Sequence, residues 1–308
     1  MADTDLGLTW TDPHGEVWDW MNGTDGVILG EGIDGILFPD FEQLTTPTPA
    51  GRRYNGTRWR PSTISATLQV ADTVVAMETT ENGPLGYRRG SAWRELDRRV
   101  RRSLSPVEPG RLVCTADGQT RYLNLRLEEM AYTVKKWPDI RGLVEYDVEL
   151  VDDEPFWKGE PLVSEFAFQE ASTADYYGGG TPGVTKGPPL FISPGNSSAS
   201  GVYVPNPGEV EAWPVWTITG PVQATIGIGD AVTELPFLGA GETLTIVTNP
   251  VHRSIVDGTG RRAWDRVPVR RFAAIPAGDM IPVVVNTTDG GPGSSVVLSI
   301  TPNHLGAY

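Results

Sequence analysis

The stretch Asn206-Pro-Gly-Glu-Val-Glu-Ala-Trp-Pro-Val-Trp-Thr-Ile-Thr-Gly-Pro221 decides the fold class of this chain. It begins with an Asn-Pro-Gly turn, passes two tryptophans into a β-branched run, and ends at a Gly-Pro turn. Tryptophan and β-branched residues favour strands, whereas Pro, Gly and Asn favour the turns that join them. Trp213 and Trp216 are three residues apart, so a regular strand places them on opposite faces, and we expect at least one of them in the core.

The same alternation of strand and turn runs through most of the chain. Gly and Pro together number 62 (36 plus 26) of 308 residues while hydrophobic residues stay at 39%, which indicates short strands joined by turns rather than disorder. We expect strands at residues 62–70, 111–115, 121–127, 143–151, 222–228, 242–248, 253–256, 262–264, 280–285 and 295–300. We expect hairpin turns at Asn55-Gly56, Asp117-Gly118 and Asp257-Gly-Thr-Gly260.

Residues 91–104 are the one convincing helix. Trp93, Leu96, Val100 and Leu104 recur at intervals of three and four, which places them on one buried stripe, and Pro106 follows the run. The opposite face carries a set of arginines that includes Arg94, Arg98, Arg101 and Arg102. This face is either a solvated surface or a contact with another subunit or partner, because arginine is enriched in interfaces.

Catalytic chemistry has no recognisable place in the sequence. The three histidines, His14, His252 and His304, lie far apart, and no nucleophile motif or zinc-binding pair accompanies them. The 39 acidic residues supply many carboxylate pairs, which makes any single pair uninformative. Cys114 is the only cysteine and is expected to be a small buried side chain. We therefore predict no catalytic, cofactor-binding or metal-binding residue, no cofactor, and no enzymatic activity.

The formal net charge of −14 bears on partners. Non-specific nucleic-acid binding depends on Lys and Arg that neutralise phosphates, so this chain is not expected to bind nucleic acid. An acidic wall suits a channel through which DNA passes, but acidity by itself more often serves only to keep a protein soluble. No apolar run approaches the length of about 18 residues that a membrane helix needs, and no signal peptide is recognisable. We expect a protein made in a bacterial cytoplasm without membrane insertion.

Three phrases, in order, carry a resemblance to a known family. They are Phe156-Trp-Lys-Gly-Glu-Pro161, the stretch from Asn206 to Pro221, and Leu244-Thr-Ile-Val-Thr248 with Trp264 downstream. Together with the 91–104 helix they make the chain resemble, over nearly its whole length, the distal tail (minor tail) proteins of long-tailed bacteriophages.

The resemblance implies two β-sandwich domains. Residues 1–153 would be a ring-forming sandwich with the single packed helix, and residues 154–308 a galectin-like or jelly-roll-like sandwich with a Gly/Pro-rich loop near 171–207. Members of the family form a hexameric ring between the tail tube protein and the tail-tip hub protein in the virion, with DNA passing through the lumen. They are structural proteins.

Two hypotheses from different classes follow. The first is a structural ring at the phage tail tip. The second is a host-glycan-binding or receptor-binding tail module that acts through its C-terminal sandwich, with receptor-binding proteins or host surface glycan as partners. Exposed Trp beside Asn and Asp on one sheet face would favour the second, because sugars stack on aromatic rings.

Overall fold

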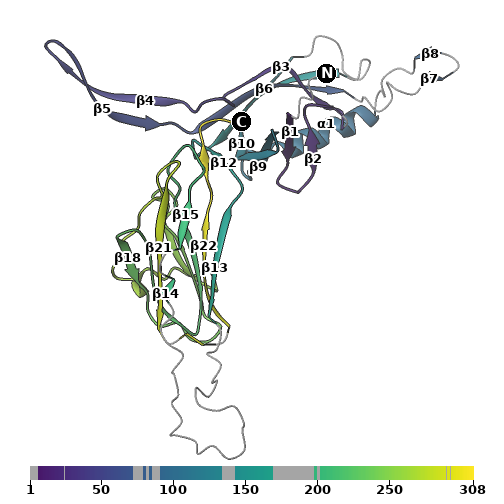
Figure 1. Cartoon of the computed structure of the whole chain (residues 1–308). Coiled ribbons are helices and arrows are strands. Elements are labelled where there is room, and N and C mark those ends of the chain that lie inside the picture. The colour runs from purple at the N-terminus through teal and green to yellow at the C-terminus, as the bar shows by residue number, and fades with distance from the viewer. Residues whose placement is uncertain are drawn as a thin grey trace, which may run out of the picture. The chain divides into compact units, whose positions relative to one another are not determined.

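The computed structural model describes residues 6–23, 25–71, 79–80, 83–84, 91–133, 143–168, 198–199, 202–288, 290–291 and 293–308. The chain divides into two compact units, Met1–Glu160 together with Asn303–Tyr308, and Pro161–Pro302 (Figure 1). The first unit therefore includes residues 303–308, which the sequence assigned to the second domain. The described residues are mainly β with a single α-helix, which confirms the predicted fold class.

The first unit is built on one large sheet with a helix. Its elements are β1 (Gly7–Thr11), β2 (Val17–Asp19), β3 (Val27–Asp34), β4 (Phe41–Thr48), β5 (Gly51–Trp59), β6 (Ser62–Ala71), β7 (Thr79–Thr80), β8 (Gly83–Pro84), α1 (Ser91–Ser103), β9 (Gly110–Ala116), β10 (Gln119–Thr133), β11 (Leu143–Asp152), β12 (Trp157–Lys158) and β23 (Asn303–His304). The strand order of the large sheet is β2-β1-β9-β10-β11-β6-β3, with β12 paired to β10 and β23 paired to β12.

Strand β10 divides this sheet into two halves. Its residues 119–125 pair with β9, and its residues 126–133 pair with β11, with a register shift between Leu127 and Glu129. Leu112 and Leu123 from one half and Ile64 and Leu150 from the other are all completely buried in the same core. The two halves therefore enclose one core between them, as in a sandwich.

Indole rings fill much of this core. The fully buried side chains include Trp10, Trp18, Trp20 and Trp157, each 1% exposed, and Trp10 stacks on Trp20 with ring centroids 5.8 Å apart. The Trp10 indole N–H donates to the carbonyl of Ser103 at the end of α1, 3.3 Å away. Large rings thus connect β1 to α1.

The predicted helix is confirmed as α1. Trp93, Leu96, Val100 and Leu104 are all at least nine-tenths buried, and α1 packs against β6. Beneath the helix, the Asp97 carboxylate accepts a hydrogen bond from the Tyr146 hydroxyl of β11 and pairs with Arg101 (2.7 Å). This network fixes the helix against the sheet.

The predicted hairpin near Asn55-Gly56 is present, but its turn is elsewhere. Strands β4 and β5 pair from Phe41↔Trp59 to Thr48↔Gly51, so the turn lies at residues 49–50. Asn55 and Gly56 sit at a register irregularity inside β5, where Gly56 has a φ of +144°. The predicted loop at 45–51 is also mostly strand, because a two-stranded ribbon has open edges that tolerate the missing N–H of Pro47. Figure 1 shows this ribbon, which we call the arm, extending beyond the other strands of its unit.

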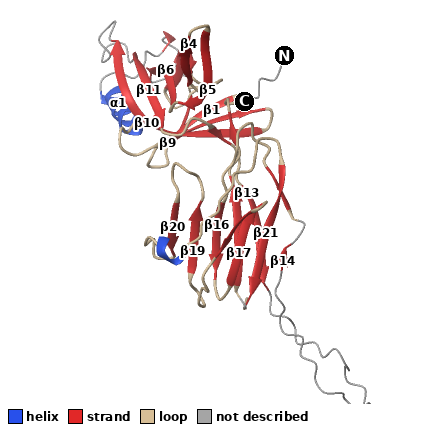
Figure 2. Cartoon of the chain, turned by 90° about the vertical axis from the view of Figure 1, so that its left-hand side faces the viewer, coloured by secondary structure: helices blue, strands red, loops and turns tan. Residues whose placement is uncertain are grey.

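The second unit consists of two facing sheets (Figure 2). Its elements are β13 (Leu162–Phe168), β14 (Ser198–Ala199), β15 (Tyr203–Pro205), β16 (Val215–Thr219), β17 (Gln223–Ile228), β18 (Ala231–Glu234), β19 (Thr243–Val247), β20 (Ser254–Asp257), the 3-10 turn η2 (Trp264–Arg266), β21 (Met280–Thr288) and β22 (Ser294–Ile300). One sheet has the order β13-β22-β16-β19-β20 and the other β14-β21-β17-β18, with β15 also on β21.

The core of the second unit is mostly aliphatic. Ile218 and Leu298 of the first sheet meet Ile226 and Val285 of the second in one cluster of buried side chains. Trp216 is 1% exposed, whereas Trp213 is half-buried, which confirms that at least one of the pair lies in the core.

Two predictions in this unit are wrong. Residues 262–264 are not a strand: Arg262 forms a single bridge with Val256, the Ala263 N–H donates to the carbonyl of Ile255 (2.9 Å), and pairing ends there because the chain turns into η2 at Trp264. Most of the predicted loop at 171–207 lies outside the described residues, but Tyr203–Pro205 within it is strand β15, paired with β21. Among the described residues, no helix is long and apolar enough to cross a membrane.

Candidate assembly surfaces

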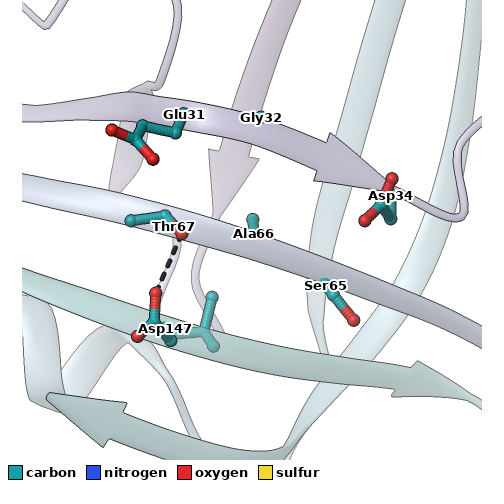
Figure 3. A pocket seen from close by; sticks show the side chains of 8 residues that line it. Glu31, Gly32, Asp34, Ser65, Ala66, Thr67 and Asp147 are labelled. Atoms are coloured by element: carbon teal, nitrogen blue, oxygen red, sulfur yellow. Dashed lines mark hydrogen bonds between the residues drawn. The ribbon is translucent and has the colours of Figure 1, made fainter.

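One face of the β10-β11-β6-β3 half-sheet is acidic (Figure 3). The strand register aligns Asp34, Ser65, Glu149 and Glu129 in one row. The next rows contain Thr67 beside Asp147 and Gln69 beside Glu145, and Glu31 lies next to Thr67 at the irregular part of β3. We call the carboxylates Glu31, Asp34, Glu129, Glu145, Asp147 and Glu149 the acidic face.

Hydroxyl and amide groups lie between these carboxylates. The Thr67 hydroxyl donates to Asp147 (2.8 Å, Figure 3), and the Gln69 amide donates to Glu145 (3.2 Å). These rows contain no basic side chain. Among the described residues, no group of three or more His, Cys, Asp or Glu side chains could hold a metal ion. The acidic face is therefore a spread of fixed negative charge rather than a chelating site.

The same half-sheet has two partly open edges. On β3, residues 30–34 have no described strand on the side away from β6, although Leu29 just before them donates to the carbonyl of Trp20 (2.7 Å). On β10, the part after Leu127 has no described strand on the side away from β11. Tyr132 at this second edge is 68% exposed. Open edges present unpaired N–H and C=O groups, which favour pairing with another chain.

The arm carries an exposed aromatic cluster at its base. Phe38, Phe41, Trp59 and Phe156 contact one another with ring centroids 5.3–6.0 Å apart, yet Phe38 and Phe41 are 49% and 46% exposed. A two-stranded ribbon is marginally stable by itself in water, and an exposed apolar cluster indicates a contact surface.

The arginines predicted on the helix all lie on its exposed face, but they differ in their partners. Arg98 pairs with Glu95 (2.7 Å) and Arg101 with Asp97 (2.7 Å). Arg94 also has an interaction partner, whereas Arg102 makes no ion pair with any residue that the structure describes. Arg99 on the same face pairs with Glu16 and lies over the ring of Trp18 at 5.0 Å. The face is thus partly neutralised within the chain.

Sequence reasoning missed the acidic face as a unit. The alternation Glu145-x-Asp147-x-Glu149 did predict a half-buried strand with a polar face. Its alignment with Asp34 and Glu129 depends on strand register across three pairings, which the local sequence pattern does not specify.

No protein-family model and no curated protein sequence matches this chain. Solved structures do match it. The SPP1 Dit protein, described as a paradigm of the hub adsorption apparatus in phages that infect Gram-positive bacteria, aligns with a TM-score of 0.57 at 10% identity, covering 97% of this chain and 98% of its own. A chain of the phage P2 baseplate in its activated conformation aligns with a TM-score of 0.51 at 13% identity, covering 96% and 98%.

The likeness covers both units, so the whole two-part fold is shared and not only a common sandwich. The expected distal-tail-protein fold is therefore confirmed.

Proposed function

We propose that this chain is a structural component of a bacteriophage tail tip, in which copies pair edge to edge into a ring around the path of the DNA. The fold shared with a phage Dit protein and a baseplate chain over nearly the full length supports the location in the virion tail. The observation that carries the ring is the half-sheet with an acidic face and an open edge on each side.

The two open edges differ, which decides the geometry of pairing. If the β3 edge of one copy joins the β10 edge of the next, each copy uses two different surfaces. Such a head-to-tail contact generates a closed ring whenever the rotation between copies closes. The family resemblance implies six copies. Four strands from each copy then make a barrel of about 24 strands, and barrels of about 16–18 strands already enclose a water-filled channel.

The acidic face then lines the channel. Duplex DNA carries about one negative charge per 1.7 Å of its axis, so a basic lining would hold it through released counterions. Carboxylates on the wall of the channel instead repel the DNA, so the channel does not retain the DNA as it passes. The packed core and α1 occupy the other face of this half-sheet, which leaves the acidic face as the one free to line a lumen.

The arm and the arginine face of α1 supply further contacts in this proposal. The aromatic cluster of the arm would be covered by a neighbouring copy, which buries rings that are now about half exposed. Arg94, Arg98, Arg101 and Arg102 would contact a second copy or the tail tube protein, and the remaining partner is the tail-tip hub protein. The protein is a structural one, made in the bacterial cytoplasm, and not an enzyme.

The test is the mass of the purified full-length protein by light scattering after size exclusion, with negative-stain images. We expect a particle of about six times 33.4 kDa that shows a central hole. Tyr132→Asp places a charge at the β10 edge and should reduce the particle to monomers. Tyr203→Asp is the matched control, because Tyr203 is 54% exposed and belongs to the second unit, which contributes neither edge. Equal assembly of both variants would contradict edge pairing.

The alternative, glycan or receptor binding through the galectin-like C-terminal sandwich, has less support. Trp216 is buried, which leaves Trp213 alone and removes a two-tryptophan platform for a sugar. A glycan array probed with the full-length protein tests this alternative directly.

A further inference from the structure

The basic residues of the second unit are concentrated in one place. Every Lys or Arg that the structure describes there lies between Arg253 and Arg271. Strand β20 is the outermost strand of its sheet, and the segment after it returns alongside through the Val256↔Arg262 bridge. We call this surface the arginine edge; it consists of Arg253, Arg261, Arg262, Arg266, Arg270 and Arg271.

Three carboxylates belong to this surface or its neighbourhood: Asp265 is exposed within the stretch itself, whereas Asp257 and Glu242 hold turns together. Asp257 accepts hydrogen bonds from the Thr259 hydroxyl (2.7 Å), the Thr259 N–H (2.9 Å) and the Arg261 N–H (3.0 Å). The bond from the Thr259 hydroxyl is the main reason that the pKa of Asp257 is lowered. Glu242 accepts from the Gly239 N–H and pairs with Arg266 (3.3 Å). Asp257 and Glu242 shape the turns that present the arginines.

The other five arginines of this edge make no ion pair with any residue that the structure describes; they are Arg253, Arg261, Arg262, Arg270 and Arg271. All five are exposed. What distinguishes these five arginines is their grouping, because the second unit has no described Lys or Arg outside this stretch. The edge therefore keeps its positive charge available.

Two of these arginines are held in fixed orientations. The Arg270 guanidinium lies 4.9 Å from the ring centre of Trp264, and its Nε and Nη2 donate to the carbonyls of Val267 and Trp264, each at 2.6 Å. Arg253 lies 5.6 Å from the ring centre of Phe272, and its Nε donates to the carbonyl of Thr248 (3.4 Å). Both side chains keep N–H groups that face no described acceptor. Prior ordering reduces the entropy lost when an anion binds.

We propose that the arginine edge is a docking surface for a polyanionic chain that carries phosphate groups. The planar guanidinium matches the oxygens of phosphate in pairs, and a row of such groups along an edge fits successive charges of a polymer. A protein partner would need an apolar centre, and Val269 is the only large apolar side chain exposed between Arg253 and Arg271. This inference stands apart from ring assembly, which uses the first unit.

The test is a titration of the full-length protein with fluorescently labelled polyphosphate, followed by anisotropy at 150 mM and at higher salt. We expect binding that weakens with salt. Arg261→Gln/Arg262→Gln/Arg271→Gln should weaken it at least tenfold and lower the salt slope by about 2, since each lost phosphate contact lowers it by about 0.7–0.9. The side chains of these three arginines form no hydrogen bond or ion pair with a residue that the structure describes, so the melting temperature should be unchanged. Arg270→Lys keeps the charge but loses the paired geometry, and should weaken binding severalfold.

The matched control removes the same charge elsewhere: Arg53→Gln/Arg58→Gln/Arg111→Gln, at exposed positions of β5 and β9, should bind as the parent protein does. Three results would overturn the proposal. The first is that no binding of polyphosphate occurs at 150 mM salt, and the second is that both triple variants lose the same affinity. The third is that polyglutamate of the same length competes as effectively as unlabelled polyphosphate does. The last result would favour an acidic protein as the partner instead.

Discussion

Two sheets of this molecule each bury apolar side chains on one face and present different chemistry on the other. The β10-β11-β6-β3 half-sheet has the six carboxylates of the acidic face. The β13-β22-β16-β19-β20 sheet instead has Thr, Ser and Val on the corresponding face, with Glu165 as its one charged residue in the described part. Core packing constrains which residues occur on the inner face of both sheets, whereas the residues on the outer face depend on what that surface contacts.

The cores differ as well. The first unit buries indole rings against a helix, and the second packs aliphatic side chains of two sheets around Trp216. If the two cores are independent, damage to one should leave the other intact. Substitutions in each core and on each surface can test that independence.

Truncation of a buried indole should separate the two units most clearly. Trp10→Ala and Trp216→Ala each remove a side chain that is 99% buried, and each should cost about 3–5 kcal/mol of unfolding free energy. We expect urea unfolding, followed by fluorescence and by limited proteolysis, to show that each variant weakens only its own unit. A single transition that shifts equally in both variants would contradict independence.

A methyl group in the first core should have the next largest effect. A Cβ at Gly110 would lie 2.3 Å from the ring of Trp10 and 2.8 Å from the carbonyl of Thr11, so Gly110→Ala should destabilise the first unit by about 1–3 kcal/mol. Gly7→Ala, on the neighbouring strand β1, is the control, because its Cβ would meet Thr115 only at 3.9 Å. Thermal unfolding of both variants measures the difference; similar melting temperatures would show that the Trp10 ring moves aside.

Alkaline pH should act on the first unit through Tyr146. Burial, followed by its hydrogen bond to Asp97, raises the pKa of Tyr146 above the ordinary value of about 10. The unfolded chain therefore loses this proton at lower pH than the folded chain does. The resulting contribution to stability is complete below pH 10 and is lost as the pH rises above it. Tyr146→Phe should flatten this part of the pH profile, measured by urea unfolding between pH 8 and 11, and an unchanged profile would exclude Tyr146 as its source.

Charge reversal on the helix should have the smallest effect on stability. Arg98→Glu/Arg102→Glu changes exposed side chains, so the unfolding free energy should shift by about 0.5 kcal/mol or less, while assembly measured by light scattering should fall if this face is a contact. Arg98→Lys/Arg102→Lys keeps the charge and serves as the control. Unchanged assembly after reversal would identify the face as a solvated one.

The sequence predicted the elements whose signals are local. The period of Trp93, Leu96, Val100 and Leu104 predicted α1, and the Asp117-Gly118 turn predicted the β9–β10 hairpin, where both residues have positive φ. Cys114 is buried, as expected.

The errors arose where a local signal had two physical outcomes. Asn55-Gly56 favours positive φ, and a β-bulge satisfies that preference as well as a turn does. The acidic face could not be predicted because it depends on which strands pair and in what register. The arginine edge was also missed: its arginines lie close in sequence, but the commitment of Asp257 and Glu242 to turns, which leaves the arginines unpaired, appears only in three dimensions.

The return of residues 303–308 to the first unit makes the second unit an insertion within it. Trp157 and His304 are direct partners across the β12–β23 ladder, Arg121 donates to the carbonyl of Gly306 (2.8 Å), and the Ala307 N–H donates to the carbonyl of Ile36 (2.8 Å). Because antiparallel partners lie about 5 Å apart, the chain leaves the first unit and returns to it at neighbouring positions. A different domain whose own termini are adjacent can be inserted at these positions without a change to the first unit. Recombination at these two junctions would therefore exchange one module and preserve the other, which is a route for diversification by cassette rather than by point substitution.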